Sequence, residues 1–234
     1  MIRRALRFSM TLAFLGTLLA AADGIPRAAL ADDAADAQAL VDKARITVDA
    51  FLGDPEMAPM RDLMRRAKGV LVVPQLLKAG FIIGGEGGSG VLLTRGQDWS
   101  APAFYTMGAG SIGLQIGAQT SEVVLIFMTE RAVDAVLHNK IKLGADASVA
   151  AGPVGAGVEA ATTTNLRNDV YSYSRNKGLF AGASFEGAVI QARDALNRAY
   201  YGQTVTPTQI LIDRAVTNRG ADPLRAALDR ILTN

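Results

Sequence analysis

Two short motifs have residue types and spacings that could do chemistry. The first, residues 85–90 (GEGGSG), matches the G-x-G-x-x-G pattern of dinucleotide-binding loops. That chemistry requires a strand before the motif and a helix after it, so that phosphate meets a helix N-terminus. Residues 91–93 (VLL) predict another strand instead, and Glu86 would repel phosphate. We therefore expect a tight glycine-rich turn in which at least one glycine has a positive φ.

The second motif, Ser174-x-x-Lys177, matches the S-x-x-K pattern of serine acyl enzymes, but its flanks are strand-like and no K-T-G follows. Ser111 has His138, the single histidine, as its one conceivable base, and a histidine near a helix end is ordinarily a surface residue. The chain has no cysteine, which excludes disulfides and thiol nucleophiles, and it has no metal-ligand spacing. The sequence therefore predicts no catalytic residue, no metal site and no cofactor.

One predicted helix, over residues 59–68, is both basic and apolar. Its cations recur at i, i+4 and i+7, and its apolar side chains form the neighbouring stripe. Such a helix can lie on an anionic membrane surface. The alternative is that the apolar stripe packs on a sheet while the cations are merely solvated. The candidate lipid-binding residues are Arg61, Arg65, Lys68, Met60, Leu63 and Met64.

The elements that must position these residues change character at Gly69. Before it, an apolar period of three and four residues predicts a helix over residues 33–52, ended by Gly53-Asp54-Pro55. After it, short runs rich in Val, Ile and Phe predict strands separated by glycines. Later helix starts are marked by a capping residue, in two cases followed by proline: Thr129, Thr206-Pro207 and Asp222-Pro223.

These patterns predict an α+β fold, with a Gly-rich antiparallel, curved or barrel-like β-sheet and with N-terminal and C-terminal helices. We expect one domain over residues 32–234. Within it, residues 32–68 form a helical lead-in, residues 69–191 are mainly β, and residues 192–234 are helical. A chain of 234 residues with 50% hydrophobic residues can bury a core without disulfides or metals.

The first 31 residues resemble a signal peptide. Arg3, Arg4 and Arg7 precede an apolar run over residues 10–22, and Ala29-Leu30-Ala31 gives the small-x-small pattern of a cleavage site. A membrane anchor is the alternative, but the run is shorter than the ~20 residues that a spanning helix needs. We expect cleavage after Ala31 and an exported protein, periplasmic or peripherally associated with the envelope membrane.

Cleavage at this point changes the charge of the protein. The whole chain has 24 basic and 22 acidic residues, for a net charge of +2. Residues 1–31 hold four of the basic residues and one of the acidic ones, so residues 32–234 have 20 and 21, for a net charge of −1. A nucleic-acid-binding protein needs a basic surface, so the sequence predicts no nucleic-acid partner.

Several long motifs, in order along nearly the whole mature chain, resemble the SYLF domain family. They include residues 69–74 (GVLVVP), 84–93 (GGEGGSGVLL), 142–157 (KLGADASVAAGPVGAG), 171–187 (YSYSRNKGLFAGASFEG) and 197–202 (NRAYYG). The resemblance implies a lipid-binding module without enzymatic activity. It also implies phosphoinositide binding for eukaryotic members and actin binding for the yeast relatives. Glu86 departs from the eukaryotic pattern, which has a basic residue there, so we expect general phospholipid binding.

We therefore expect a non-enzymatic phospholipid- or membrane-binding protein of the bacterial cell envelope. Headgroup contact at the basic helix and insertion of a lipid chain into a cavity in the sheet are both open modes. The alternative function is a structural or assembly protein that binds another envelope protein through a sheet edge.

Overall fold

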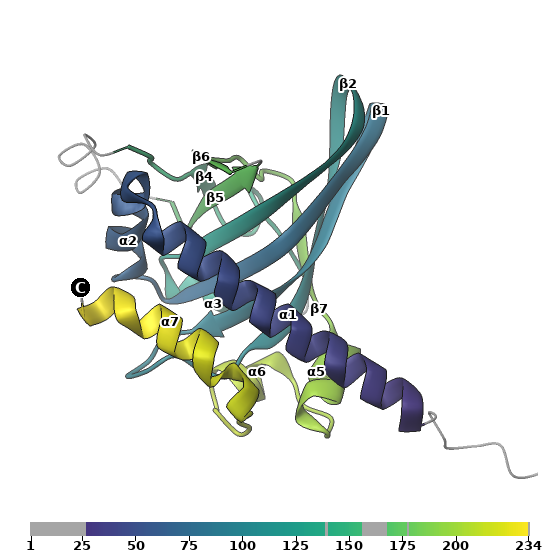
Figure 1. The fold of residues 1–234 in the computed structure, drawn as a ribbon, viewed down its shortest axis with the longest axis vertical. Coiled ribbons are helices and arrows are strands. Elements are labelled where there is room, and N and C mark those ends of the chain that lie inside the picture. The colour runs from purple at the N-terminus through teal and green to yellow at the C-terminus, as the bar shows by residue number, and fades with distance from the viewer. Residues whose placement is uncertain (1–26, 139, 156–167, 177, 234) are drawn as a thin grey trace, which may run out of the picture.

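A computed structural model describes residues 27–138, 140–155, 168–176 and 178–233. It confirms the α+β class, because a single curled, mostly antiparallel sheet packs against helices from both ends of the chain (Figure 1). Most of the predicted signal peptide, and residues 156–167 of the segment predicted to be mainly β, lie outside the described residues. Among the helices that the structure describes, none has both the length and the apolar character needed to cross a bilayer.

Helix α1 (Arg27–Gly53) follows the predicted period and starts six residues earlier than expected. Its side chains at Ala37, Val41 and Val48 are buried and point at the sheet. Asp54 then caps a short 3-10 helix, η1 (Pro55–Met57), by accepting a hydrogen bond from the Glu56 N–H. Helix α2 (Ala58–Met64) follows directly and ends before Lys68, so residues 65–68 lead from the helix into the sheet.

The centre of the sheet is a two-stranded ribbon of β1 (Gly69–Thr94) and β2 (Ala103–Phe127). The two strands pair antiparallel over nearly their whole length, so the short strands predicted along this segment join into two long ones. The register shifts between Gly80 and Ile82, where β2 has two more residues than β1. Both strands bend sharply there (Figure 1), and the strand outside a bend needs the extra residues.

The other strands extend the sheet from the free edge of β2. Strand β7 pairs with the start of β2 and strand β5 pairs with its end, which gives the order β3-β7-β2-β5-β4, with β6 paired to β5. The bounds of these strands are β3 (Lys140–Lys142), β4 (Val149–Ala151), β5 (Val170–Asn176), β6 (Leu179–Gly182) and β7 (Val189–Ala192).

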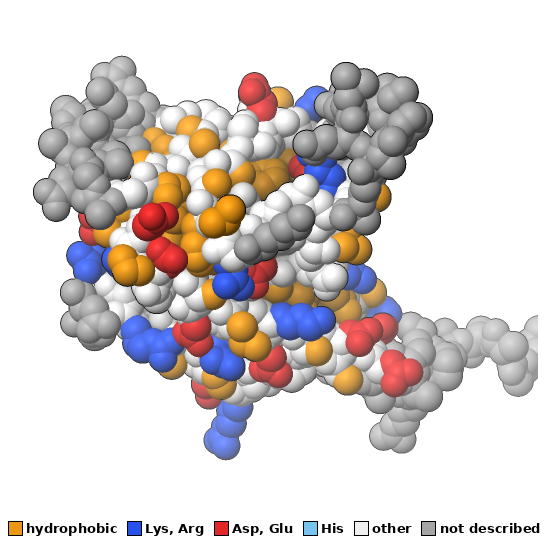
Figure 2. Space-filling model, turned by 45° about the horizontal axis from the view of Figure 1, so that its top comes forward, with side chains coloured by type: hydrophobic (Ala, Val, Ile, Leu, Met, Phe, Trp, Pro, Cys, Tyr) orange, Lys and Arg blue, Asp and Glu red, His pale blue; other side chains and the backbone are white. Residues whose placement is uncertain are grey.

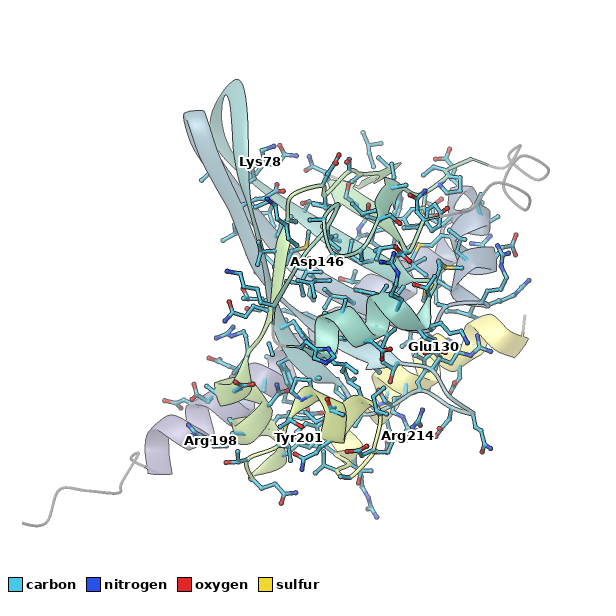
Figure 3. All side chains as sticks on the ribbon, turned by 180° about the vertical axis from the view of Figure 1, so that it is seen from behind. Lys78, Glu130, Asp146, Arg198, Tyr201 and Arg214 are labelled. Carbon is cyan, nitrogen blue, oxygen red and sulfur yellow. The ribbon has the colours of Figure 1, made fainter. Side chains whose placement is uncertain are left out.

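Helices cover both faces of this sheet. Figure 1 shows α1 crossing one face diagonally with α7 (Asp222–Thr233) beside it, and Figure 3 shows α3 (Glu130–Leu137) on the opposite face. Side chains alternate along the strands, so Val70 and Val72 pack under α1 while Leu71 and Val73 join the core under α3. The remaining helices are α5 (Asp194–Tyr201), α6 (Pro207–Leu211) and the 3-10 helix η2 (Arg219–Ala221).

Candidate functional site

The apolar half of the predicted lipid site lies inside the protein. Met60, Leu63 and Met64 are each at most 1% exposed and belong to the core between α1, α2 and the sheet. A membrane-facing role for these three side chains is not compatible with this burial, which corrects that part of the prediction. The physical reason is that α2 has one apolar stripe, and the sheet already covers it.

The guanidinium of Arg61 makes hydrogen bonds to the backbone of its own chain. One of its guanidinium nitrogens donates to the carbonyl oxygen of Leu52, at 3.1 Å, and to that of Asp54, at 2.7 Å. The last carbonyls of a helix have no partner within the helix, so Arg61 satisfies groups at the C-terminal end of α1. The first cation of the predicted strip is therefore turned toward its own chain.

Arg65 and Lys68 are exposed, with side chains that are 44% and 45% accessible. The Arg65 Nε donates to the Ile231 carbonyl at 3.1 Å, which joins α2 to α7. Lys68 lies 2.9 Å from Glu130, which Figure 3 labels at the start of α3. The carboxylates that face these two cations, Asp62 and Glu130, are themselves exposed, so both ion pairs are weak.

Two further arginines, the exposed Arg66 and the half-buried Arg95, lie beside these cations. Arg66 is exposed, and Arg95 donates a backbone hydrogen bond to the Lys68 carbonyl at 2.9 Å and a side-chain hydrogen bond to the Arg65 carbonyl. Neither Arg66 nor Arg95 forms an ion pair with any residue in the described ranges. We call Arg65, Arg66, Lys68 and Arg95 the basic patch. Arg95 is not predictable from the local pattern, because only the folded β1 strand brings it to Lys68 from the opposite end.

The glycine motif lies within β1 and is not a turn. No glycine within residues 84–90 has a positive φ, so the prediction of a tight turn there is wrong. The requirement for glycine is instead spatial. A Cβ on Gly88 would lie 2.3 Å from the Gln75 carbonyl oxygen, and one on Gly90 would lie 2.5 Å from that of Val72. The two halves of β1 therefore approach each other too closely for side chains, and the motif continues into strand with no helix to hold a phosphate.

The residues weighed for catalysis are dispersed. His138 is exposed at the end of α3 and donates from Nδ1 to the Asp134 carbonyl at 2.6 Å. Ser174 lies in β5, and Lys177 lies outside the described residues. The described ranges contain no cluster of three or more His, Asp or Glu side chains that could hold a metal ion.

A cavity of about 240 Å³ lies beside the turn between β1 and β2. Arg214, labelled in Figure 3, and Arg225 line it, and both guanidinium groups contact the carboxylate of Asp98. The Arg225 Nε also donates to the Trp99 carbonyl at 2.9 Å. Asp98 thus neutralises much of this charge, and the arginines tie the turn to the C-terminal helices.

Together, the fold and this surface define a single-sheet α+β domain built on a folded β-ribbon, with an exposed basic patch where its first helices meet the sheet. Residues 108–231 match the family model described as "Ysc84: Las17-binding protein actin regulator". The chain belongs to this family, the Ysc84/SYLF domain family, as its sequence motifs suggested.

Individual relatives support this membership. The chain is 39% identical to "Protein YSC84" of Saccharomyces cerevisiae over 172 residues, which are 71% of this chain and 36% of the relative. It is 33% identical to human "SH3 domain-containing YSC84-like protein 1" over 170 residues, which are 71% of this chain and 49% of the relative. The chain thus spans less than half the length of these two curated relatives.

Proposed function

We propose that this protein is a non-enzymatic phospholipid-binding protein that associates peripherally with a membrane of the bacterial envelope. The observation that carries the proposal is the basic patch, where Arg65, Arg66 and Lys68 are exposed and Arg95 is half-buried beside them. Neither Arg66 nor Arg95 has a counter-ion among the described residues. Membership of the SYLF family supports it, because the family resemblance implies a lipid-binding module. Las17 binding and actin regulation are named for the family, and we propose neither for this chain.

The attraction must be local to the patch. Residues 32–234 carry a net charge of −1, so the protein as a whole is not drawn to an anionic surface. A Lys or Arg held near such a surface contributes on the order of 1 kcal/mol. Four such residues give about 4 kcal/mol, which corresponds to binding on the order of millimolar and suits a reversible peripheral protein.

The proposal is tested by reversing Arg66 and Lys68 together, R66E with K68E. These two residues are chosen because neither holds a buried group, so the fold should survive. Binding to vesicles of phosphatidylglycerol and phosphatidylethanolamine, measured by co-sedimentation at low salt, should weaken at least ~30-fold. The matched control reverses two exposed lysines elsewhere, K43E with K142E, and should bind nearly as the wild type. Equal loss in both variants, or none in the first, would contradict the proposal.

A salt series separates the two modes of lipid binding that the sequence left open. Near 1 M salt the Debye length falls to ~3 Å, so headgroup attraction at the patch should largely disappear. Insertion of a lipid chain into an apolar cavity depends on buried area and would change little with salt. Binding that is the same at low and high salt would therefore favour the cavity.

The alternative function, assembly with another envelope protein through a sheet edge, has less support. Strand β3 lies at one end of the sheet and exposes Lys140 and Lys142. Charged residues on an edge strand oppose pairing with another chain.

A further inference from the structure

The cavity beside the turn between β1 and β2 is lined by three segments that are far apart in the chain. Residues 98–101 of the turn form one wall, Arg214 with residues 216–218 forms a second, and Arg225 of α7 forms a third. Its volume of about 240 Å³ is below the ~300–1,000 Å³ of sites that take a whole drug-sized ligand. The cavity therefore suits one chemical group of a larger molecule rather than the whole of it.

The cavity has an excess of hydrogen-bond donors. Arg214 and Arg225 share the carboxylate of Asp98, which is the one acidic residue among the described residues that line it. Each guanidinium has five N–H groups. Within the described ranges Arg214 donates two of them, both to Asp98. Arg225 donates three, two of them to the carboxylates of Asp98 and Asp222. The remaining N–H groups of both side chains are available to an oxygen-rich anion.

The ion pairs at the cavity can be exchanged for those of a ligand. The Asp98 side chain is 58% accessible, and those of Arg214 and Arg225 are 33% and 31% accessible. Ion pairs with this exposure contribute little to stability. A phosphate group, which accepts two parallel hydrogen bonds from a guanidinium, can therefore join or replace the Asp98 carboxylate.

Two features of the lining residues are of kinds found at binding sites. Arg214 has a φ of +53°, and it is the only non-glycine residue in the described ranges with a positive φ. Backbone strain of this kind is concentrated at functional sites. Trp99 is 1% exposed, and its indole N–H has no hydrogen-bond partner among the described residues. A buried donor without a partner is rare, and an oxygen-bearing ligand beside Trp99 offers one.

The cavity shares its turn with the basic patch. Arg95 of the patch pairs with Trp99 across the turn, and its backbone N–H donates to the Lys68 carbonyl at 2.9 Å. Arg65 of the patch is joined to the far end of α7, the helix that carries Arg225. Figure 2 shows acidic and basic side chains intermixed over the lower part of the face in view. Where charges of both signs alternate, an anion is recognised by local groups rather than by a broad field.

We propose that this cavity binds the phosphate group of one phospholipid headgroup, held by Arg214 and Arg225. The inference rests on the proposed function and gives the membrane-bound protein a site for a single lipid molecule beside the basic patch. A phosphodiester carries one negative charge, which balances the excess of one cation over Asp98 among the described lining residues. Soluble phosphate compounds present the same oxygens, so the test compares them with lipid.

Trp99 reports on the cavity without a label, because it is the single tryptophan of the chain. Dihexanoyl phosphatidylglycerol is added as monomers, below its critical micelle concentration, and binding is followed by Trp99 emission and by calorimetry. We expect saturable binding. R214Q should weaken it by at least ~tenfold, because hydrogen bonds from a charged group are lost. The matched control, R219Q, changes an exposed arginine close by in the chain and should bind as the wild type does.

A second variant acts in the opposite direction. D98N removes the carboxylate that competes for both guanidinium groups, so the lipid should bind about threefold to fivefold more tightly. A change that merely loosened the turn would weaken binding instead. Weaker binding by D98N than by the wild type would therefore contradict the proposal.

Free phosphates separate the two sources of this chemistry. Inorganic phosphate has no carbon atoms for Ala101 and Val216, which also line the cavity, to contact. Glycerol phosphate adds the glycerol, and the lipid adds the first carbons of its chains. We expect affinity to rise in the order inorganic phosphate, glycerol phosphate, lipid. Binding of either soluble phosphate as tightly as the lipid would identify a soluble ligand and overturn the lipid assignment.

The patch variant separates failure of this inference from failure of the proposed function. R66E with K68E should lose vesicle binding but keep its affinity for the monomeric lipid within about twofold, because the two sites use different side chains. Loss of monomer binding in that variant would overturn the cavity as the lipid site. So would a wild type that binds vesicles but gives neither heat nor emission change with the monomer. Intact monomer binding by a wild type that does not bind vesicles would overturn membrane association alone.

Discussion

At the scale of single residues, Gly87 and Gly88 show how two neighbours in one strand differ in what they require. A Cβ on Gly87 would lie 3.7 Å from the Met107 carbonyl oxygen, which is ordinary contact, whereas one on Gly88 would lie 2.3 Å from that of Gln75. We expect G88A to lower the free energy of unfolding by about 1–3 kcal/mol through overpacking. Thermal denaturation should show a fall of several degrees for G88A and almost none for G87A. Equal effects of the two variants would mean that the backbone around Gly88 is not as crowded as these distances indicate.

Asp169 is the most highly connected carboxylate of the described chain, and it is 5% exposed. It accepts hydrogen bonds from the hydroxyls of Thr129 and Ser148, both at 2.8 Å, and forms an ion pair with Arg131. Burial alone would raise the pKa of Asp169, but the hydrogen bonds from Ser148 and Thr129 and the charge of Arg131 lower it below 3.8. This one side chain therefore links the start of α3 to β5 and to the segment before β4.

The lowered pKa of Asp169 makes its contribution depend on pH. The folded protein holds the carboxylate ionised more strongly than the unfolded chain does, so its stabilisation is complete above the ordinary pKa of 3.8 and is lost as pH falls through the lower, folded value. We expect D169N to cost about 1–3 kcal/mol at pH 7. Melting curves of both proteins should keep this gap down to pH 5 and converge below pH 3.8. A gap that persists unchanged in acid would assign the effect to something other than the charge.

At the scale of elements, the junction of α1 and α2 depends on Arg61. Its hydrogen bonds to the carbonyls of Leu52 and Asp54 end α1, whereas Arg66 on the same segment is exposed. We expect R61A to lower the free energy of unfolding by about 1–2 kcal/mol and R66A to change it by less than about 0.5 kcal/mol. Urea denaturation measures both. This difference is also why Arg61 is absent from the charge-reversal variant, since its loss would confuse stability with lipid binding.

At the scale of the whole molecule, we expect export with cleavage after Ala31. Such cleavage would remove the first residues of α1, which starts at Arg27, while the first buried residue of that helix in the described core is Ala37. A chain that starts at Asp32 should therefore melt within about 2 °C of the full chain. Mass spectrometry of the protein from its host should find Asp32 at the N-terminus. An intact Met1 on the protein recovered from the cell would contradict export.

Much of the architecture follows from local rules that act within a few residues. Thr129 and Thr206 cap α3 and α6 as their types and spacing predict, and α1 shows the expected apolar period. The change from a helical to a strand pattern at Gly69 coincides with the first residue of β1. These features are local because a cap or a period involves groups separated by four residues or fewer. The fold class and the order of its elements were therefore predictable.

The sequence by itself determined these elements, the family motifs and the cations of residues 61–68, but not which surfaces face solvent. Only the tertiary structure decided that Met60, Leu63 and Met64 are core, that Arg95 joins Lys68, and that Gly88 is required by crowding. The first depends on the packing of α1, α2 and the sheet, and the other two depend on the ribbon folding back on itself. Both kinds of packing bring together residues far apart in the chain. An amphipathic pattern shows that a stripe will be covered, but what covers it is set by long-range packing, which no local pattern encodes.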